Sequence, residues 1–185
     1  LPQSQIQTAI VLISRTSYLP NHSNSTQIRS GLAITAGIVL KNLMNALTTR
    51  ADMQVTEAAW TEISRHAQDA FPDECCGVIV SDGRSDHAHR LKNMQNTLHA
   101  HDPQTYPRTA EIAYAMDPLE LEAVIRQAET NGQKLKAFYH SHPNHDAYFS
   151  AEDKAFACPF GEPTYPDTAQ IVISIYNRAV RIMRA

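Results

Sequence analysis

Through most of the chain, short apolar runs alternate with longer stretches in which apolar residues recur at helical spacing. Strand-length apolar runs occupy 75–81, 134–140 and 170–176, and amphipathic stretches occupy 56–70 and 118–131. Neither kind of element can bury its apolar face alone, so the strands and helices must pack on one another. The alternation therefore predicts a mixed α/β domain of α+β type, with one sheet sandwiched by helices.

Turn and breaker residues predict the remaining elements. In chain order, these are a strand at 53–55, a polar strand from the Asp82-Gly83 turn to Leu91, a long loop at 93–108, a strand at 110–116, a short helix from Ser150 and a strand at 179–183 that closes a hairpin.

The first 52 residues differ in character from the rest. Residues 1–30 are rich in Ser, Thr, Gln and Asn and contain no acidic residue, and 31–47 carry a single apolar stripe at helical spacing. We therefore expect 1–52 to be an N-terminal extension, partly helical or disordered, and 53–185 to be the folded domain.

Composition argues against several classes of partner. Sixteen Lys and Arg against nineteen Asp and Glu give a formal charge of −3, with no Lys/Arg block, so we expect no nucleic acid partner. The longest apolar run, 31–40, is shorter than the roughly 20 residues that a bilayer requires, so we expect no membrane partner. Cys75, Cys76 and Cys158 fit neither a disulfide framework nor a zinc ribbon, and free thiols predict a cytoplasmic protein.

Two histidines, a serine and an aspartate carry the strongest chemical signal. His140 and His142 lie two residues apart at the end of an expected strand, so their side chains point to the same face. Ser150 has the character of a helix N-cap, which places Asp153 in the first turn of that helix. Two imidazoles and one carboxylate suit Zn²⁺, with a fourth position left for water, as catalytic zinc sites require.

The spacing of these residues resembles the motif of the JAMM (MPN+) zinc metallopeptidases, which is His-Ser-His, seven residues beginning with Pro, Ser, two residues and Asp. That family also carries an upstream glutamate before Cys-Gly, and the segment Pro72-Asp73-Glu74-Cys75-Cys76-Gly77 resembles this context. The segment 161–167 resembles the stand-alone bacterial members. The resemblance covers 53–185 and leaves 1–52 unexplained.

The resemblance implies that His140, His142 and Asp153 bind one catalytic Zn²⁺, that Glu74 is the general base, and that Ser150 donates a hydrogen bond to the tetrahedral intermediate. It also implies a cytidine-deaminase-like JAMM/MPN fold, with a mixed, curved sheet sandwiched by helices. The chemistry is consistent with these roles. Zinc lowers the pKa of its bound water to about 7, and a neighbouring carboxylate can move the proton to the leaving amine.

The resemblance further implies a substrate class. JAMM enzymes hydrolyse the bond after the Gly-Gly end of ubiquitin-like proteins, and the stand-alone bacterial members trim ubiquitin-like sulfur-carrier proteins. We expect the same activity and partner here. Two alternatives stay open: a deubiquitinase-like isopeptidase that acts on protein conjugates, and a non-catalytic MPN scaffold that only binds.

Several other residues have the chemistry for a site, but their surroundings favour simpler interpretations. We expect His145 to be exposed or to face substrate, Asp146 and Glu152 to be solvated carboxylates, and Cys75 and Cys76 to be packing residues. The pairs His87/His89 and His99/His101 are expected to be polar surface residues rather than ligands. The loop 93–108 and the aromatic pair Tyr148-Phe149 are expected to form walls of a substrate channel.

Overall fold

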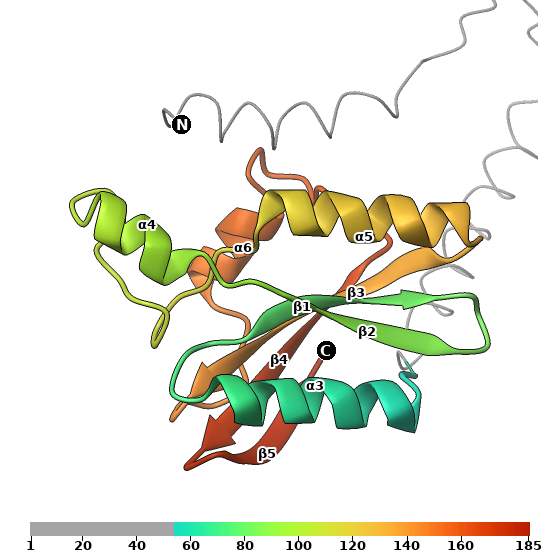
Figure 1. Cartoon of the computed structure of the whole chain (residues 1–185), viewed down its shortest axis with the longest axis horizontal. Helices are drawn as coiled ribbons and strands as arrows, with labels where there is room; N and C mark the ends of the chain where they lie inside the picture. Colours follow the sequence, from blue (N-terminus) through green and yellow to red (C-terminus); the bar gives the residue numbers. More distant parts are fainter. Residues whose placement is uncertain (1–53) are drawn as a thin grey trace, which may run out of the picture. The chain divides into compact units, whose positions relative to one another are not determined.

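A computed structural model of the protein describes residues 54–185 (Figure 1). The extension expected at 1–52 lies outside the described residues. The described elements are, in chain order, α3 (Glu57–Ala70), β1 (Cys76–Ser81), β2 (Asp86–Leu91), α4 (Gln95–His101), α5 (Pro118–Thr130), β3 (Lys134–Pro143), α6 (Ala151–Ala157), β4 (Ala169–Tyr176) and β5 (Ala179–Arg184).

One five-stranded sheet organises these elements, with the strand order β2-β1-β3-β4-β5. Neighbouring strands are antiparallel except β3 and β4, which run parallel, so the sheet is mixed. Figure 1 shows α3 against one face of the sheet and α5 against the other, with α4 and α6 near one end. The predicted α+β class, a mixed sheet between helices, is confirmed.

The helix α3 forms because its apolar residues share one face. Ala59, Ile63 and Ala67 follow helical spacing and are buried. The helix ends at Ala70, ahead of Pro72, which cannot continue a helix.

The helix α5 is defined by its two ends. The Asp117 side chain accepts hydrogen bonds from the backbone N–H groups of Leu119 and Glu120, and Pro118 occupies the first turn. At the other end Gly132 has a φ of 69°, a left-handed conformation in which glycine ends a helix without a steric penalty. Both ends agree with the sequence prediction.

Three expected elements differ from the observed ones. Residues 54 and 55 form no strand, and the next backbone N–H, that of Thr56, donates to the side chain of Asp86. The predicted loop 93–108 contains the helix α4, whose one buried residue, Gln95, is polar and therefore leaves no apolar stripe in the sequence. The predicted strand 110–116 is irregular and makes only one bridge, between Met116 and Asn93.

The central strand β3 is longer than the sequence indicates. It continues past His140 to Pro143, and the chain turns at Asn144, which has a φ of 58°. Residues 137–143 are all buried, since β3 has a strand on each side and a helix over each face of the sheet. The polar residues near its end are therefore carried into the protein interior, where they need partners.

A close approach of two strands explains the glycine of the Cys-Cys-Gly segment. A Cβ atom at Gly77 would overlap the backbone oxygen of His89 and the hydroxyl of Tyr139. The Tyr139 hydroxyl fills the space that a side chain at Gly77 would take, and it donates to the His89 oxygen at 3.3 Å. Only glycine fits between them without a shift of the backbone.

A buried carboxylate joins three elements at the other end of β2. Asp86 accepts hydrogen bonds from the Thr56 N–H at 2.8 Å and from the Lys136 ammonium at 2.8 and 2.9 Å. Burial of Asp86 acts to raise its pKa, but the bonds from Lys136, Ser81 and Thr56 outweigh burial and hold the pKa below its ordinary value. A carboxylate with a lowered folded-state pKa stabilises the fold above its unfolded pKa of about 3.9, and this stabilisation is lost as the pH falls through the folded-state value.

We expect Asp86→Asn to lower the free energy of unfolding by about 1–3 kcal/mol at pH 7, because the charge-assisted bonds to Asp86 are lost. The difference should shrink at pH 3, because the unfolded-state carboxyl takes up a proton below about pH 3.9 whereas the native carboxyl, with its lowered pKa, gives up its charge only at lower pH. Urea denaturation at the two pH values measures both quantities. Equal stability of the two proteins at pH 7, or a difference that does not change with pH, would contradict this account of Asp86.

Candidate active site

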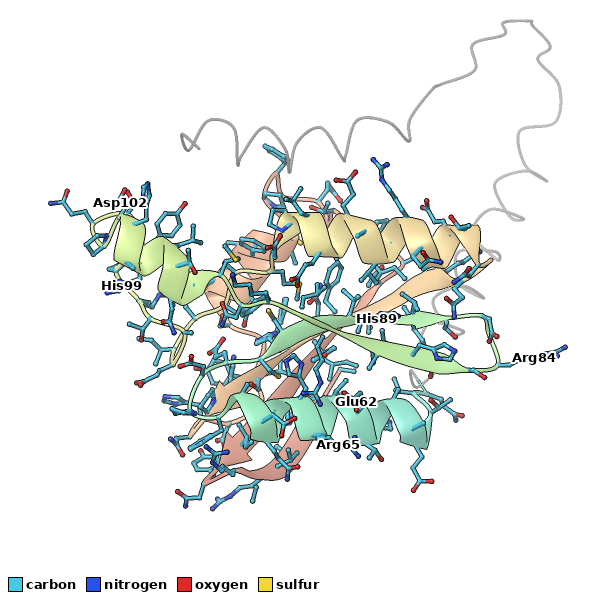
Figure 2. All side chains as sticks on the ribbon, viewed as in Figure 1. Glu62, Arg65, Arg84, His89, His99 and Asp102 are labelled. Atoms are coloured by element: carbon cyan, nitrogen blue, oxygen red, sulfur yellow. The ribbon has the colours of Figure 1, made fainter. Side chains whose placement is uncertain are left out.

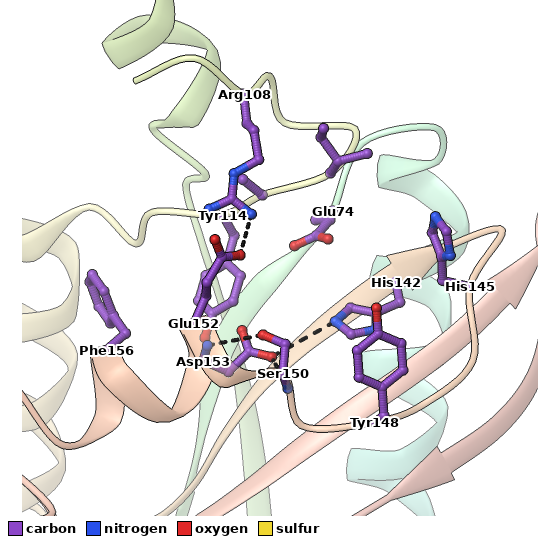
Figure 3. A pocket seen from close by; sticks show the side chains of 12 residues that line it. Glu74, Arg108, Tyr114, His142, His145, Tyr148, Ser150, Glu152, Asp153 and Phe156 are labelled. Atoms are coloured by element: carbon purple, nitrogen blue, oxygen red, sulfur yellow. Dashed lines mark hydrogen bonds and ion pairs between the residues drawn. The ribbon is translucent and has the colours of Figure 1, made fainter. Parts of the chain in front are cut away.

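A pocket opens where the end of β3, the start of α6 and the irregular segment before α5 meet (Figure 3). Figure 3 shows Arg108, Glu152 and Phe156 on one side of it and Tyr148 and His145 on the other. Its lining includes Glu74, Ser150, His142 and Asp153, and His140 lies directly beside it. The structure thus brings together all five residues that the sequence singled out.

The two imidazoles and the carboxylate converge on one point. The Nε2 atoms of His140 and His142 are 3.2 Å apart, and they lie 3.5 and 4.0 Å from Oδ2 of Asp153. Tetrahedral ligands bound to zinc at about 2.0–2.2 Å are about 3.3–3.6 Å from each other. Among the described residues, this is the only group of three or more His, Cys, Asp or Glu side chains that could hold a metal ion.

The proton arrangement of His142 also suits a metal ligand. Its Nδ1 lies 3.0 Å from the backbone oxygen of Asp146, to which it donates, so the neutral ring presents an unprotonated Nε2 to the site. Burial and the neighbouring His140 lower the pKa of His142, which keeps the ring neutral. The Nε2 atoms of the two rings lie 3.2 Å apart and face the Asp153 carboxylate, so a cation at this point would be within reach of all three groups. The residues fit a divalent metal.

The carboxylate of Asp153 is held in place by the first turn of α6. The Ser150 N–H donates to Oδ2 of Asp153 at 2.8 Å, and the Asp153 N–H donates to the Ser150 hydroxyl oxygen at 3.0 Å. This reciprocal pair is a capping box. Burial acts to raise the pKa of Asp153, but His140 and Ser150 outweigh it and hold the pKa well below its usual range. Asp153 is therefore an anion ready to bind a cation.

The hydroxyl of Ser150 lines the pocket beside the proposed ligands. Within the capping box its oxygen acts as an acceptor, which leaves the hydroxyl hydrogen for a bond to something in the pocket. The helix α6 begins at the next residue, so any group that accepts this hydrogen also faces the first turn of α6. Ser150 thus has the placement of a donor to a developing negative charge.

Glu74 is a buried carboxyl group on the opposite wall of the pocket, just before β1. Burial raises its pKa to about 8, the negative charge of Asp153 adds to the rise, and Arg108 opposes it. A carboxyl group whose pKa lies near neutrality is suited to accept a proton and release it again.

An aromatic ring packs against each of the two histidines. Tyr114 stacks on the ring of His140, with the ring centroids 4.4 Å apart and an angle of 23° between the planes. Tyr148 packs edge-on against His142, with the centroids 4.9 Å apart. The sequence predicted Tyr148 and Phe149 as channel walls, and of these Tyr148 lines the pocket while Phe149 does not. Tyr114 was missed because its spacing from the histidines carries no known pattern.

The pocket also contains an ion pair that the sequence did not predict. Arg108, at the end of the 93–108 segment, pairs with Glu152 in the first turn of α6. The Glu152 side chain is 65% exposed, in agreement with the expected solvated carboxylate, and its ion pair with Arg108 is an additional contact. Sequence alone could not bring together two exposed charges that lie 44 residues apart.

His145 and Asp146 lie where the sequence placed them, whereas His99 and His101, expected in a loop, belong to α4. His145 is exposed and lines the pocket, and Asp146 is exposed. Figure 2 shows His89 on β2 and His99 on α4, and neither belongs to a metal-binding group within residues 54–185. Cys75 and Cys76 are buried, and burial raises the pKa of the Cys75 thiol to about 12, so neither is a nucleophile.

Among the described helices, none has the length and apolar character required to cross a membrane.

Two characterised proteins are similar to this chain in sequence. The desampylase of Haloferax volcanii is 27% identical over 110 residues, which cover 57% of this chain and 73% of that protein. The CysO-cysteine peptidase of Mycobacterium tuberculosis is 28% identical over 137 residues, which cover 74% of this chain and 79% of that protein.

A solution structure of a protein from Desulfitobacterium hafniense matches with a TM-score of 0.48 and 24% identity, covering 69% of this chain and 86% of that one. Residues 56–183, well over half of the chain, match the family described as prokaryotic homologs of the JAB domain. The resemblance indicated by the histidine–aspartate motif is thereby confirmed, and the chain belongs to the prokaryotic JAB-domain family.

Proposed function

We propose that the protein is a zinc-dependent peptidase that hydrolyses the bond after a C-terminal Gly-Gly of a ubiquitin-like sulfur-carrier protein. One observation carries the proposal. A metal-binding group of two histidines and an aspartate shares one pocket with a buried carboxyl of raised pKa, Glu74, and a hydroxyl donor, Ser150. The relatives named desampylase and CysO-cysteine peptidase support hydrolysis as the reaction class.

His140, His142 and Asp153 would hold the zinc ion, through Nε2, Nε2 and Oδ2. When bound, zinc supplies a Lewis acid that polarises the scissile carbonyl and lowers the pKa of water at the site to about 7. The His142 side chain is kept in the metal-binding tautomer by the Asp146 carbonyl, and the Asp153 carboxylate is oriented by the capping box.

Glu74 moves the proton during the reaction. The Glu74 carboxylate accepts a proton from the attacking water, whose oxygen forms the new bond to the carbonyl carbon. It then passes that proton to the amine nitrogen as the C–N bond breaks. The second proton of the water leaves the new carboxyl group for the released amine, so the products are a carrier that ends in a carboxylate and an ammonium group. The pKa of Glu74, about 8 beside Asp153, falls when positive charge enters the pocket, and this favours the ionised form needed at the start.

Ser150 stabilises the negative charge that develops on the carbonyl oxygen. Its hydroxyl hydrogen is not used by the capping box, and the first turn of α6 lies beside it. Removal of one such donor from an acyl-transfer site costs about 10²–10³ in kcat. We assign the aromatic wall at Tyr148, which is 53% exposed, to contact with the substrate tail.

The three cysteines are free thiols, which suits the cytoplasm that we propose as the location of the enzyme.

We expect the zinc-loaded protein to remove residues that extend beyond the Gly-Gly of a sulfur-carrier protein, as a loss of intact mass. Glu74→Gln should lower kcat by about 10³ or more, because an amide cannot accept the proton, while zinc binding is kept. Glu129→Gln, an exposed change on α5, is the matched control and should keep full activity.

Cleavage by Glu74→Gln at the wild-type rate would exclude Glu74 as the base. Absence of cleavage by a wild-type protein that still binds zinc would exclude the carrier substrate and favour an isopeptidase that acts on protein conjugates.

We expect one zinc ion per chain, and we expect bound zinc to raise the melting temperature because the ion binds the folded ligand set. His142→Ala should weaken zinc binding at least 100-fold, whereas His87→Ala, an exposed change on β2, should not. Titration calorimetry and melting curves with and without chelator measure both effects. Equal zinc affinity of the two variants would contradict the assigned ligand set.

The raised pKa of Glu74 also predicts a pH dependence of stability in the metal-free protein. A carboxyl with a raised folded-state pKa contributes stability that is complete below its unfolded value of 4.5 and is lost as the pH rises through about 8. Glu74→Gln is uncharged at every pH and removes this loss.

At pH 8.5, metal-free Glu74→Gln should therefore be more stable than wild type by a few kcal/mol, since one pKa unit corresponds to about 1.4 kcal/mol. At pH 4.5 the two proteins should be similar. Melting curves in the presence of chelator give the comparison, and identical curves at pH 8.5 would show that Glu74 is not a destabilising buried anion.

A further inference from the structure

The side chain of Asn93 sits behind the pocket and uses its full hydrogen-bonding capacity on backbone groups. Its Nδ2 donates to the backbone oxygens of Glu74 at 2.9 Å and Ala113 at 3.2 Å. Its Oδ1 accepts from the backbone N–H groups of Gln95 at 2.9 Å and Ala115 at 3.1 Å. A primary amide has two donor hydrogens and two acceptor positions, and all four are occupied.

These bonds connect two residues of the pocket. The backbone oxygen of Glu74 accepts one of the bonds from Asn93, and the Glu74 N–H donates to the backbone oxygen of Ala110 at 2.7 Å. Tyr114 lies between two of the other bonded residues, Ala113 and Ala115, and its ring stacks on His140. One amide thus joins the backbone of the proposed base to the residue that packs on a proposed metal ligand.

Neither Glu74 nor Tyr114 belongs to a strand of the sheet, so the hydrogen bonds between strands do not fix their positions. The strand β1 begins at Cys76, so Glu74 precedes the first strand pair of β1 with β3. The segment that carries Tyr114 forms only one bridge, between Met116 and Asn93. Since sheet ladders leave these backbone groups unpaired, the Asn93 side chain takes the place of a ladder at this point.

We propose that Asn93 is a positioning residue of the hydrolytic reaction, because its amide fixes the Glu74 backbone relative to the Tyr114–His140 stack. The inference rests on the function proposed above. Asn93 does not line the pocket, so it acts through Glu74 and not by contact with substrate. Misplacement of a catalytic group by about 1 Å can cost about 10²-fold in rate.

The metal ligands themselves are anchored elsewhere. His140 and His142 belong to β3, and Asp153 is held by the capping box at the start of α6. None of the four hydrogen bonds of Asn93 reaches these residues. Loss of the Asn93 amide should therefore lower kcat while the affinity for zinc and the KM for the carrier stay nearly unchanged.

The test compares Asn93→Ala and Asn93→Asp with Asp86→Asn, using the zinc-loaded full chain and a sulfur-carrier protein extended beyond Gly-Gly. Asn93→Asp keeps two acceptor oxygens but loses both donors to the Glu74 and Ala113 oxygens. Asp86→Asn removes a similar polar junction at the far end of β2 and controls for destabilisation alone. Each variant is measured well below its melting temperature, for kcat, KM and zinc affinity.

We expect both Asn93 variants to lose about 10- to 100-fold in kcat, with KM and zinc affinity changed less than threefold. Asp86→Asn should keep kcat within twofold. In a Glu74→Gln background, single-turnover assays should show that Asn93→Ala causes less than a twofold further loss, because the base through which it acts is already absent.

Three results would overturn the inference. The first is a folded Asn93→Ala or Asn93→Asp protein with wild-type kcat. The second is an equal loss of kcat in the Glu74→Gln background, and the third is a loss that tracks zinc affinity. If the wild-type protein cleaves no carrier, the proposed function fails, and this inference fails with it. If wild type cleaves and Glu74→Gln does not, the proposed function stands, and the kcat of the Asn93 variants alone decides whether Asn93 is a positioning residue.

Discussion

The burial of three consecutive polar residues at the end of the central strand is the constraint on which the rest of the structure depends. His140, Ser141 and His142 are at most 7% exposed. Buried polar groups are costly unless they find partners, and these three find theirs in the loop after β3, at the start of α6 and just before β1. Ser141 accepts from the Cys75 N–H, His142 donates to the Asp146 carbonyl, and His140 lies beside Asp153.

The hydrogen bonds that these buried polar residues of β3 need also bring the residues of the proposed site together. The Cys75 N–H donates to the Ser141 hydroxyl, and the Ser141 N–H donates to the Cys75 carbonyl. These two bonds hold Cys75, the residue after Glu74, against β3. On the other side, the turn after Pro143 and the capping box of α6 return Asp153 to the histidines. Elements that begin as ordinary sheet and helix thus converge at one end of β3, where polar groups replace apolar packing.

The sequence predicted the regular elements well wherever apolar periodicity was strong. The buried face of α3, the ends of α5 and the closing hairpin all follow from local patterns. It failed at α4, whose buried residue is Gln95, and at 110–116, whose backbone bonds to a side chain instead of to a strand. The five residues proposed for the site were singled out because their spacing resembles a family motif. Tyr114, Arg108 and Asn93 were missed because their contacts depend on the folded arrangement, which local spacing does not encode.

The parallel pairing of β3 and β4 requires the chain to cross from one end of the sheet to the other, and α6 lies on that crossing. Two proposed ligands precede the crossing, and the third lies eleven residues after His142, within it. An ion bound by all three closes a short loop, for which the entropic cost is small because it grows only with the logarithm of loop length. Such an ion would fix the beginning of the connection from β3 to β4, much as a removable cross-link would. Ordering of the connection from β3 to β4 and binding of the metal are then coupled, so that each favours the other.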